Sequence, residues 1–397
     1  MLKKLLHTLV IASTLFSVSV SQAQTPGPVP GPAAGSVPIV PTAPQLAATS
    51  YLLIDANSGA VLVEHNPDVR LPPASLTKMM TSYIARLEIQ RGQLKEDDLV
   101  LVSEKAWRKG GSKMFIEVGN QVRVIDLLRG IIIQSGNDAS IAIAEHIAGS
   151  EEAFADLMNS HAKRLGMTNT HFLNSTGWPA EGHLTSSRDM ATLARATIRD
   201  DPEYYKIYKE KEFVWNGIRQ PNRNLMLWRD PSVDGLKTGH TEEAGYCLVA
   251  SAERDGMRLI SVVMGTTSEA ARAAETQKLL TWGFRFFETR TFYQPGQVLS
   301  NARVWAGADN TVEVGLTDGL IMTLPKGTLD KLEASITMNP AIKAPIAAGD
   351  VLGQVEVRDG DKVVHSAPVV ALADVEEAGI FGRLWDSIRL FFYGLFN

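Results

Sequence analysis

The stretch Pro72-Pro73-Ala74-Ser75-Leu76-Thr77-Lys78 runs directly into an apolar segment, residues 79–85, that predicts a helix. The two prolines fit a turn that leads into this helix. Because residues i and i+3 share one helix face, the Ser75 hydroxyl and the Lys78 amine can meet within hydrogen-bond distance. A partly desolvated lysine can take the proton of a nucleophilic serine. Ser160 and Lys163 have the same spacing, so the pair alone fits a helix start with an exposed lysine equally well.

The composition is that of a folded protein of ordinary charge. The 397 residues are 45% hydrophobic and 21% charged, which allows two domains with a sizeable core. A net charge of −5 provides no strong basic field, so we expect no nucleic-acid partner. The single cysteine, Cys247, excludes an internal disulfide and lies in an apolar run typical of a core strand. Eight scattered histidines without a His-Glu-x-x-His motif predict neither a metal site nor a cofactor.

The N-terminus has the three parts of a secretory signal peptide over residues 1–23. Lys3-Lys4 precedes an apolar run from Leu5 to about Val20, and Ser21-Gln22-Ala23 forms a small-residue exit. An uncleaved anchor is the alternative to cleavage after Ala23. Residues 24–47 are rich in Pro, Gly and Ala and predict an extended linker. We therefore expect the mature protein to work outside the cytoplasm.

The next 243 residues, 48–290, predict an α/β domain whose sheet is built from distant parts of the chain. Two strands joined by a turn are expected over 48–64, and a hairpin over 244–265. The middle, 123–161, is helical with short breaks, and a helix is expected over 269–289.

Two further segments follow this domain. Residues 291–375 contain short alternating runs between Gly, Asp and Pro turns, which predict a small all-β domain. Residues 376–397 predict an amphipathic helix, whose charges leave too short an apolar run to span a bilayer. We expect an in-plane membrane anchor, and a helix docked on the protein's own core is the alternative. The apolar stripe consists of Ile380, Phe381, Leu384, Trp385, Ile388, Phe391, Phe392, Leu395 and Phe396.

Two short motifs can complete a site around Ser75. Ser135-Gly136-Asn137 marks a turn before a predicted helix and can point a hydroxyl and a carboxamide into a cleft, although both residue types also cap helices. Lys237-Thr238-Gly239 offers a cation and a hydroxyl to a carboxylate, and its glycine would let a substrate backbone approach an edge strand. A solvated edge strand with protective charge is the alternative.

The order of the three motifs is specific where each alone is weak. Ser75-Leu76-Thr77-Lys78, Ser135-Gly136-Asn137 and Lys237-Thr238-Gly239 follow one another as in the penicillin-interacting serine enzymes. The chain resembles the low-molecular-mass penicillin-binding proteins that are serine-type D-alanyl-D-alanine carboxypeptidases, class C, similar to peptidase family S11. This resemblance implies an antiparallel sheet flanked by helices with a helical subdomain, then a small all-β domain and a C-terminal amphipathic helix.

The resemblance also implies a two-step acyl transfer. Ser75 would attack the carbonyl between the last two D-alanines of a peptidoglycan stem pentapeptide, with Lys78 as base. The backbone N–H groups of Ser75 and His240 would hold the oxyanion. Ser135 and Asn137 would assist proton transfer and bind the substrate amide.

The same resemblance places the substrate's terminal carboxylate on Lys237, Thr238 and Gly239, with Arg272 as a further candidate. β-Lactams would acylate Ser75 as mimics of the dipeptide. The segment 106–115 is expected to border this active site.

Partners implied are the stem peptide, β-lactam antibiotics and, through the C-terminal helix, a membrane surface. The expected location is the periplasm, attached to the outer face of the cytoplasmic membrane. Two alternatives stay open: a β-lactamase of the same fold, and a low-turnover penicillin- or peptidoglycan-binding scaffold or sensor. No Gly-x-Ser-x-Gly elbow precedes a plausible nucleophile, and no Glu-x-x-Leu-Asn lies between Ser135 and Lys237. The sequence leaves the oligomeric state open.

Overall fold

The computed structural model describes residues 40–380, 382, 383, 385, 386 and 389. The predicted signal peptide, 1–23, and the first part of the predicted linker lie outside these residues. Residues 40–47 contain no helix or strand, and Ala43 and Leu46 pack against the core on the α9 side of the main sheet.

A five-stranded antiparallel sheet forms the centre of the first domain, with the order β2-β1-β9-β8-β7. Strands from both ends of the domain meet in it, as predicted, because β1 pairs along its whole length with β9. Alternate residues of β1 face opposite layers: Leu52 and Ile54 belong to the core below the helical subdomain, whereas Tyr51 and Leu53 pack with α9. The strands are β1 (Ser50–Asp55), β2 (Val61–His65), β7 (Val233–Thr241), β8 (Gly245–Arg254) and β9 (Met257–Thr266).

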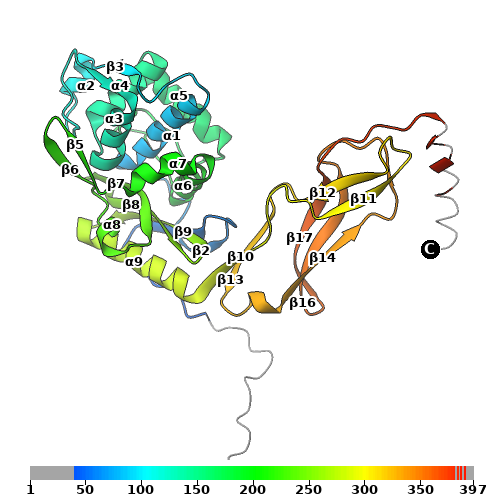
Figure 1. The fold of residues 1–397 in the computed structure, drawn as a ribbon. Coiled ribbons are helices and arrows are strands. Elements are labelled where there is room, and N and C mark those ends of the chain that lie inside the picture. The colour runs from blue at the N-terminus through cyan, green and yellow to red at the C-terminus, as the bar shows by residue number, and fades with distance from the viewer. Residues whose placement is uncertain (1–39, 381, 384, 387–388, 390–397) are drawn as a thin grey trace, which may run out of the picture. The chain divides into compact units, whose positions relative to one another are not determined.

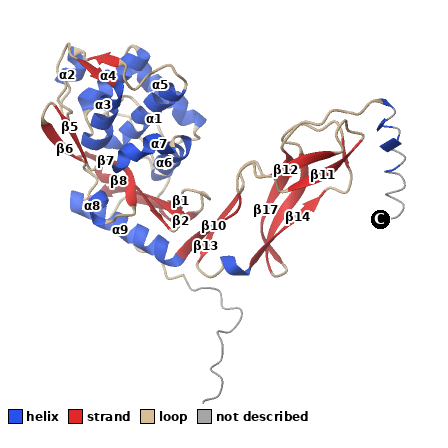
Figure 2. Cartoon of the chain, in the orientation of Figure 1, coloured by secondary structure: helices blue, strands red, loops and turns tan. Residues whose placement is uncertain are grey.

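Helices cover both faces of this sheet (Figures 1 and 2). One layer is α8 (Met226–Arg229) and α9 (Glu269–Phe286). The other layer is a helical subdomain built around α1 (Lys78–Gln90), whose first eight residues are all buried. Its remaining elements are η1 (Ala74–Thr77), α2 (Glu104–Arg108), α3 (Val124–Arg129), η2 (Gly130–Gln134), α4 (Asn137–Ala148), α5 (Glu151–Arg164), α6 (Ser187–Asp200), α7 (Pro202–Tyr205) and η3 (Lys206–Lys209), with the hairpins β3 (Leu99–Leu101)–β4 (Gln121–Arg123) and β5 (Glu212–Trp215)–β6 (Ile218–Pro221).

The predicted helix 269–289 is three residues too long. Helix α9 ends at Phe286, and β10 (Phe287–Tyr293) begins at the next residue. Strand β10 pairs with β13 (Leu320–Pro325), and this pairing places Thr289 opposite Thr323. The side chain of Thr289 is β-branched and favours a strand once a partner strand is available.

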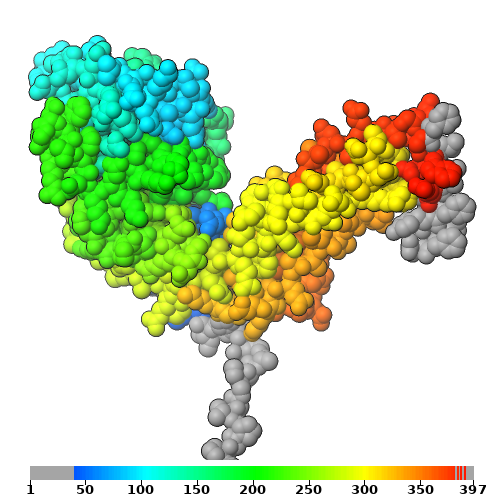
Figure 3. Space-filling model, in the orientation of Figure 1, coloured from blue at the N-terminus to red at the C-terminus, as the bar shows by residue number. Residues whose placement is uncertain are grey.

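The second domain is all-β, as predicted. A six-stranded sheet with the order β14-β16-β17-β12-β11-β15 has its own apolar core, which includes Val304, Val314, Val355 and Val369. The space-filling view shows the residues of this domain, coloured yellow to orange-red, as a closely packed body (Figure 3). The elements are β11 (Ser300–Trp305), β12 (Thr311–Gly315), η4 (Leu329–Lys331), β14 (Leu332–Met338), β15 (Ile342–Lys343), β16 (Val351–Asp359) and β17 (Lys362–Ala371).

The predicted C-terminal helix is described only in part. Ile380 and Trp385 of the apolar stripe are 74% and 58% exposed. Asp386, from the polar side, is buried and accepts a hydrogen bond from the Ala306 amide at 3.0 Å. Within the described ranges, no helix is long and apolar enough to cross a membrane. The other stripe residues lie outside the described part of the chain: Phe381, Leu384, Ile388, Phe391, Phe392, Leu395 and Phe396.

Candidate active site

Ser75 and Lys78 meet at the junction of η1 and α1. The Lys78 Nζ lies 3.0 Å from the Ser75 Oγ and donates a second hydrogen bond, of 2.5 Å, to the Thr176 carbonyl. The Lys78 side chain is fully buried. Ser160 and Lys163, which repeat the spacing on α5, are both exposed to solvent. Burial therefore separates the two pairs where spacing does not.

The amine of Lys78 titrates far below an ordinary lysine. Burial is the largest cause that lowers its pKa to about 7, because the charged form loses its hydration. The positive charges of Arg223 and Lys109 lower this pKa further, and the carboxylates of Asp138 and Glu151 oppose them. A substantial fraction of Lys78 is consequently neutral near pH 7 and can accept a proton.

The Ser-x-Asn motif lies in the turn between η2 and α4. Ser135 has a left-handed backbone (φ 66°), and its buried Oγ has no hydrogen-bond partner among the described residues. The N-cap of α4 is Gly136, without a side-chain cap, so neither Ser135 nor Asn137 serves as the helix cap considered above. Instead, the side-chain amide of Asn137 donates a hydrogen bond of 2.7 Å to the Gly110 carbonyl. The segment 106–115 therefore borders the motif, as expected.

Lys237 and Thr238 lie on β7, which is an edge strand of the sheet. Both are almost fully buried, and the Lys237 amine donates to the Thr238 carbonyl at 3.1 Å. Gly239 also allows a close approach within the protein. A Cβ at this position would lie 3.0 Å from the Pro73 carbonyl oxygen and 3.3 Å from Leu76. The glycine thus lets β7 pack against the segment that carries Ser75.

Arg272 reaches this strand from α9. It is buried, donates to the Gly239 carbonyl at 3.3 Å and pairs with Glu269 at 3.3 Å. His240 is exposed and stacks on Tyr246 with ring centroids 3.9 Å apart.

The site carries an excess of positive charge. Burial is the largest cause that lowers the pKa of Lys237 well below its usual value, and the charges of Lys78, Arg223 and Arg272 add to it. Within the described ranges, neither Lys78 nor Lys237 has a carboxylate at ion-pair distance. No group of three or more His, Cys, Asp or Glu residues in the described part of the chain could hold a metal ion. This arrangement suits a substrate that supplies a negative charge of its own.

A cavity of about 520 Å³ adjoins the nucleophile. It is lined by Pro72, Pro73 and Ala74, by residues 177–184, and by Thr241 and Glu243. Trp178 in this wall is half exposed, and the Lys109 amine lies 4.5 Å from its ring centroid.

Comparison with known proteins identifies the family. Residues 38–268 match the D-alanyl-D-alanine carboxypeptidase family, and residues 287–377 match the C-terminal domain of penicillin-binding protein 5. The chain belongs to the D-alanyl-D-alanine carboxypeptidase family. The resemblance inferred from the three motifs is thereby confirmed.

Individual relatives of this family match most of the chain. D-alanyl-D-alanine carboxypeptidase DacA of Escherichia coli is 47% identical over 367 residues, covering 90% of this chain and 91% of the relative. The crystal structure of penicillin-binding protein 5 from Haemophilus influenzae superposes with a TM-score of 0.78 at 44% identity, covering 85% of this chain and 99% of that one. Penicillin-binding protein D2 of Listeria monocytogenes, solved in an ampicillin-bound form, gives a TM-score of 0.56 at 30% identity, covering 60% and 98%.

Sequence reasoning about this carboxypeptidase missed several residues that support Lys78. The carboxylate of Glu151 accepts hydrogen bonds from the Ser175 amide (3.1 Å) and hydroxyl (2.9 Å), next to the Thr176 carbonyl that binds Lys78. Arg223 places a positive charge near Lys78, and no spacing in the sequence indicates its position. These contacts join residues far apart in the chain, so the sequence carries no local signal for them.

Proposed function

We propose that this protein is a serine carboxypeptidase that removes the terminal D-alanine from peptidoglycan stem pentapeptides. The observation that carries the proposal is the 3.0 Å contact between the Ser75 hydroxyl and a fully buried lysine whose pKa is about 7. A neutral amine at this distance is a general base for a serine nucleophile. Family membership supports D-alanyl-D-alanine as the reacting end of the substrate.

Acylation then follows from the positions of these groups. Lys78 takes the hydroxyl proton while the Ser75 Oγ bonds to the carbonyl carbon between the two D-alanines. The backbone N–H groups of Ser75 and His240 hold the oxyanion. As the C–N bond breaks, the proton passes to the leaving amine of D-alanine. The unpartnered hydroxyl of Ser135 is available to relay that proton.

Recognition of the substrate's end uses the excess positive charge. Lys237, Thr238 and Arg272 hold the terminal carboxylate, which provides the counter-charge that the buried Lys237 amine lacks. Asn137 binds the substrate amide. The part of the peptide that precedes the scissile bond extends into the cavity lined by Trp178 and residues 72–74.

Water resolves the acyl-enzyme and releases the shortened peptide. A β-lactam acylates the same serine, because its ring amide imitates the terminal dipeptide. The resulting acyl-enzyme is hydrolysed more slowly than the one formed with the peptide. The reaction takes place in the periplasm, where the C-terminal helix attaches the protein to the outer face of the cytoplasmic membrane. The exposure of Ile380 and Trp385 supports this attachment.

Release of D-alanine tests the proposal. The purified chain should release D-alanine from a diacyl-Lys-D-alanyl-D-alanine peptide. The Ser75→Ala variant should release it at least about 10³-fold more slowly than the wild type. Ser160→Ala is the matched control and should keep the wild-type rate, because that serine is exposed on α5. Absence of release from the wild-type chain would overturn the proposal.

Intact mass after benzylpenicillin separates the two alternatives. A long-lived adduct on Ser75 together with D-alanine release identifies a carboxypeptidase. Rapid turnover of the penicillin indicates a β-lactamase, and an adduct without D-alanine release indicates a binding scaffold.

A further inference from the structure

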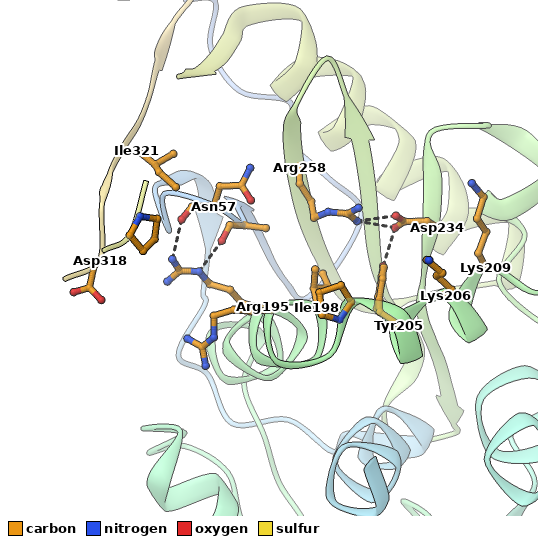
Figure 4. A pocket seen from close by; sticks show the side chains of 14 residues that line it. Asn57, Arg195, Ile198, Tyr205, Lys206, Lys209, Asp234, Arg258, Asp318 and Ile321 are labelled. Carbon is orange, nitrogen blue, oxygen red and sulfur yellow. Dashed lines mark hydrogen bonds and ion pairs between the residues drawn. The ribbon is translucent and has the colours of Figure 1, made fainter. Parts of the chain in front are cut away.

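A second large cavity lies at the end of α6 and over α7 and η3, and Pro295, Asp318 and Ile321 of the β-domain complete its lining (Figure 4). Its volume is about 1150 Å³, and its lining contains none of the residues assigned to the active site. Five cationic side chains line it, against two carboxylates. The cations are Arg195, Arg199, Lys206, Lys209 and Arg258, and the carboxylates are Asp234 and Asp318.

One of the two carboxylates, Asp234, is already paired within the protein. Asp234 accepts two hydrogen bonds from Arg258, of 2.7 and 2.9 Å, and a third of 2.7 Å from the Tyr205 hydroxyl. Arg199 pairs with the half-buried Asp200, whereas Lys206 pairs with Glu203 in solvent, where an ion pair is weak. Among the residues that line the cavity, the five cations outnumber the two carboxylates, Asp234 and Asp318.

Arg195 and Lys209 are the cations without a carboxylate at ion-pair distance among the described residues. Two backbone carbonyls orient the guanidinium of Arg195: Ala56 at 2.7 Å and Asn57 at 3.0 Å. These carbonyls fix its direction without neutralising its charge. Arg195 is thus held in one orientation before a ligand binds, so binding costs little further side-chain conformational entropy.

The charges are divided between two ends of the cavity. Arg195 and Arg199 share one face of α6 at i and i+4, and Lys206 and Lys209 share one face of η3 at i and i+3. Figure 4 shows Arg195 separated from Lys206 and Lys209, and between them lie Ile198, Tyr205 and the ion pair of Arg258 with Asp234. Two cationic ends separated by a region whose own charges are paired match an elongated ligand rather than a single small anion.

We propose that this cavity binds an elongated ligand with two separated oxyanionic groups, phosphate or carboxylate. One group meets Arg195 and Arg199, the other meets Lys206 and Lys209, and the spacer lies over Ile198 and Tyr205. Guanidinium and ammonium groups both bind such oxyanions, and two linked groups gain over one through effective concentration. The site needs only side chains of the catalytic domain for these contacts.

Calorimetry on the full chain with hexane-1,6-diyl bisphosphate tests this site. We expect saturable binding about tenfold tighter than that of hexyl phosphate, and weaker binding as salt is added. Hexanedioate is the second probe, and comparison of the two dianions distinguishes phosphate from carboxylate as the preferred group.

Variants decide whether the binding is at this cavity. Lys209→Gln and Arg195→Gln should each weaken the bisphosphate at least about fivefold. Lys163→Gln, an exposed lysine elsewhere, is the matched control and should bind as wild type. Lys209 is exposed, so its variant keeps the fold, and the rate of acylation by benzylpenicillin checks folding in each case. No saturable binding, equal affinity for the mono- and bisphosphate, or unchanged affinity in both variants would overturn the proposal.

Discussion

Lys78 and Lys163 show how one residue type at one spacing acquires different chemistry. Both follow a serine by three positions, yet Lys163 is solvated and Lys78 has no access to water. Burial disfavours the ammonium form, so the pKa of Lys78 falls to about 7. The base needed for acylation is therefore produced by the environment and not by the motif itself.

The rate of acylation should consequently depend on the protonation of Lys78. Below pH 7 the amine is protonated and cannot accept the Ser75 proton, so the second-order rate constant for benzylpenicillin should rise with pH through about 7 and then level off. Intact-mass kinetics between pH 5 and pH 9 measure this rise, which is the acid limb of the pH profile of acylation. Lys78→Arg should lower the rate by about 10²- to 10⁴-fold, since arginine stays charged. Lys163→Arg is the control, and a flat profile for the folded wild type would contradict the assignment.

Residue types and motif order were predictable, whereas their supports were not. The sequence predicted that Ser75, Ser135 and Lys237 belong to one site, because ordered motifs specify a family. It did not predict Glu151 or the Thr176 carbonyl, which lies 98 residues from Lys78. It also did not predict that Gly239 makes room for Pro73 and Leu76, in addition to the substrate approach expected there.

Among the elements, the segment 110–116 binds one buried carboxylate through three consecutive backbone N–H groups. Asp138 is fully buried at the start of α4 and accepts backbone hydrogen bonds from Met114 (2.8 Å), Phe115 (2.9 Å) and Ile116 (3.3 Å). The same segment presents the Gly110 carbonyl to Asn137. One helix end thus fixes both the Ser-x-Asn turn and the wall beside it.

Asp138→Asn should change both stability and pH dependence. An amide NH₂ cannot accept the backbone N–H bonds, so the free energy of unfolding should fall by about 1–3 kcal/mol, measured by urea denaturation. The carboxylate also raises the pKa of Lys78, so its loss should move the acid limb of the acylation profile to lower pH. A purely structural role would lower the rate without moving this limb. Asp156→Asn, at an exposed position on α5, is the control. If the acid limb of the Asp138→Asn profile does not move, the Asp138 carboxylate does not raise the pKa of Lys78.

Element types followed from the sequence more closely than element ends. Periodicity predicted α9, but its last turn was assigned to Thr289, because only the pairing of β10 with β13 ends the helix at Phe286. Such pairing depends on a strand more than thirty residues away and leaves no mark in the local pattern.

For the whole molecule, the open question is how the chain stays near its polymeric substrate. The polar side of the C-terminal segment contacts the protein, since Asp386 accepts from Ala306, while Ile380 and Trp385 face solvent. Large exposed apolar side chains of this kind bury themselves in the boundary region of a bilayer.

Deletion of residues 378–397 should therefore abolish binding to anionic phospholipid vesicles in a flotation assay, while D-alanine release from a soluble peptide is retained. The double variant Ile380→Ser/Trp385→Ser should weaken flotation at least about tenfold, because burial of each side chain contributes roughly 1.5–3 kcal/mol. Val363→Ser/Val364→Ser removes two other exposed apolar side chains, on β17, and should float as wild type. If the truncated chain floats unchanged, the anchor lies elsewhere. If it neither floats nor releases D-alanine, the segment stabilises the fold instead, because the reaction itself requires only residues of the catalytic domain.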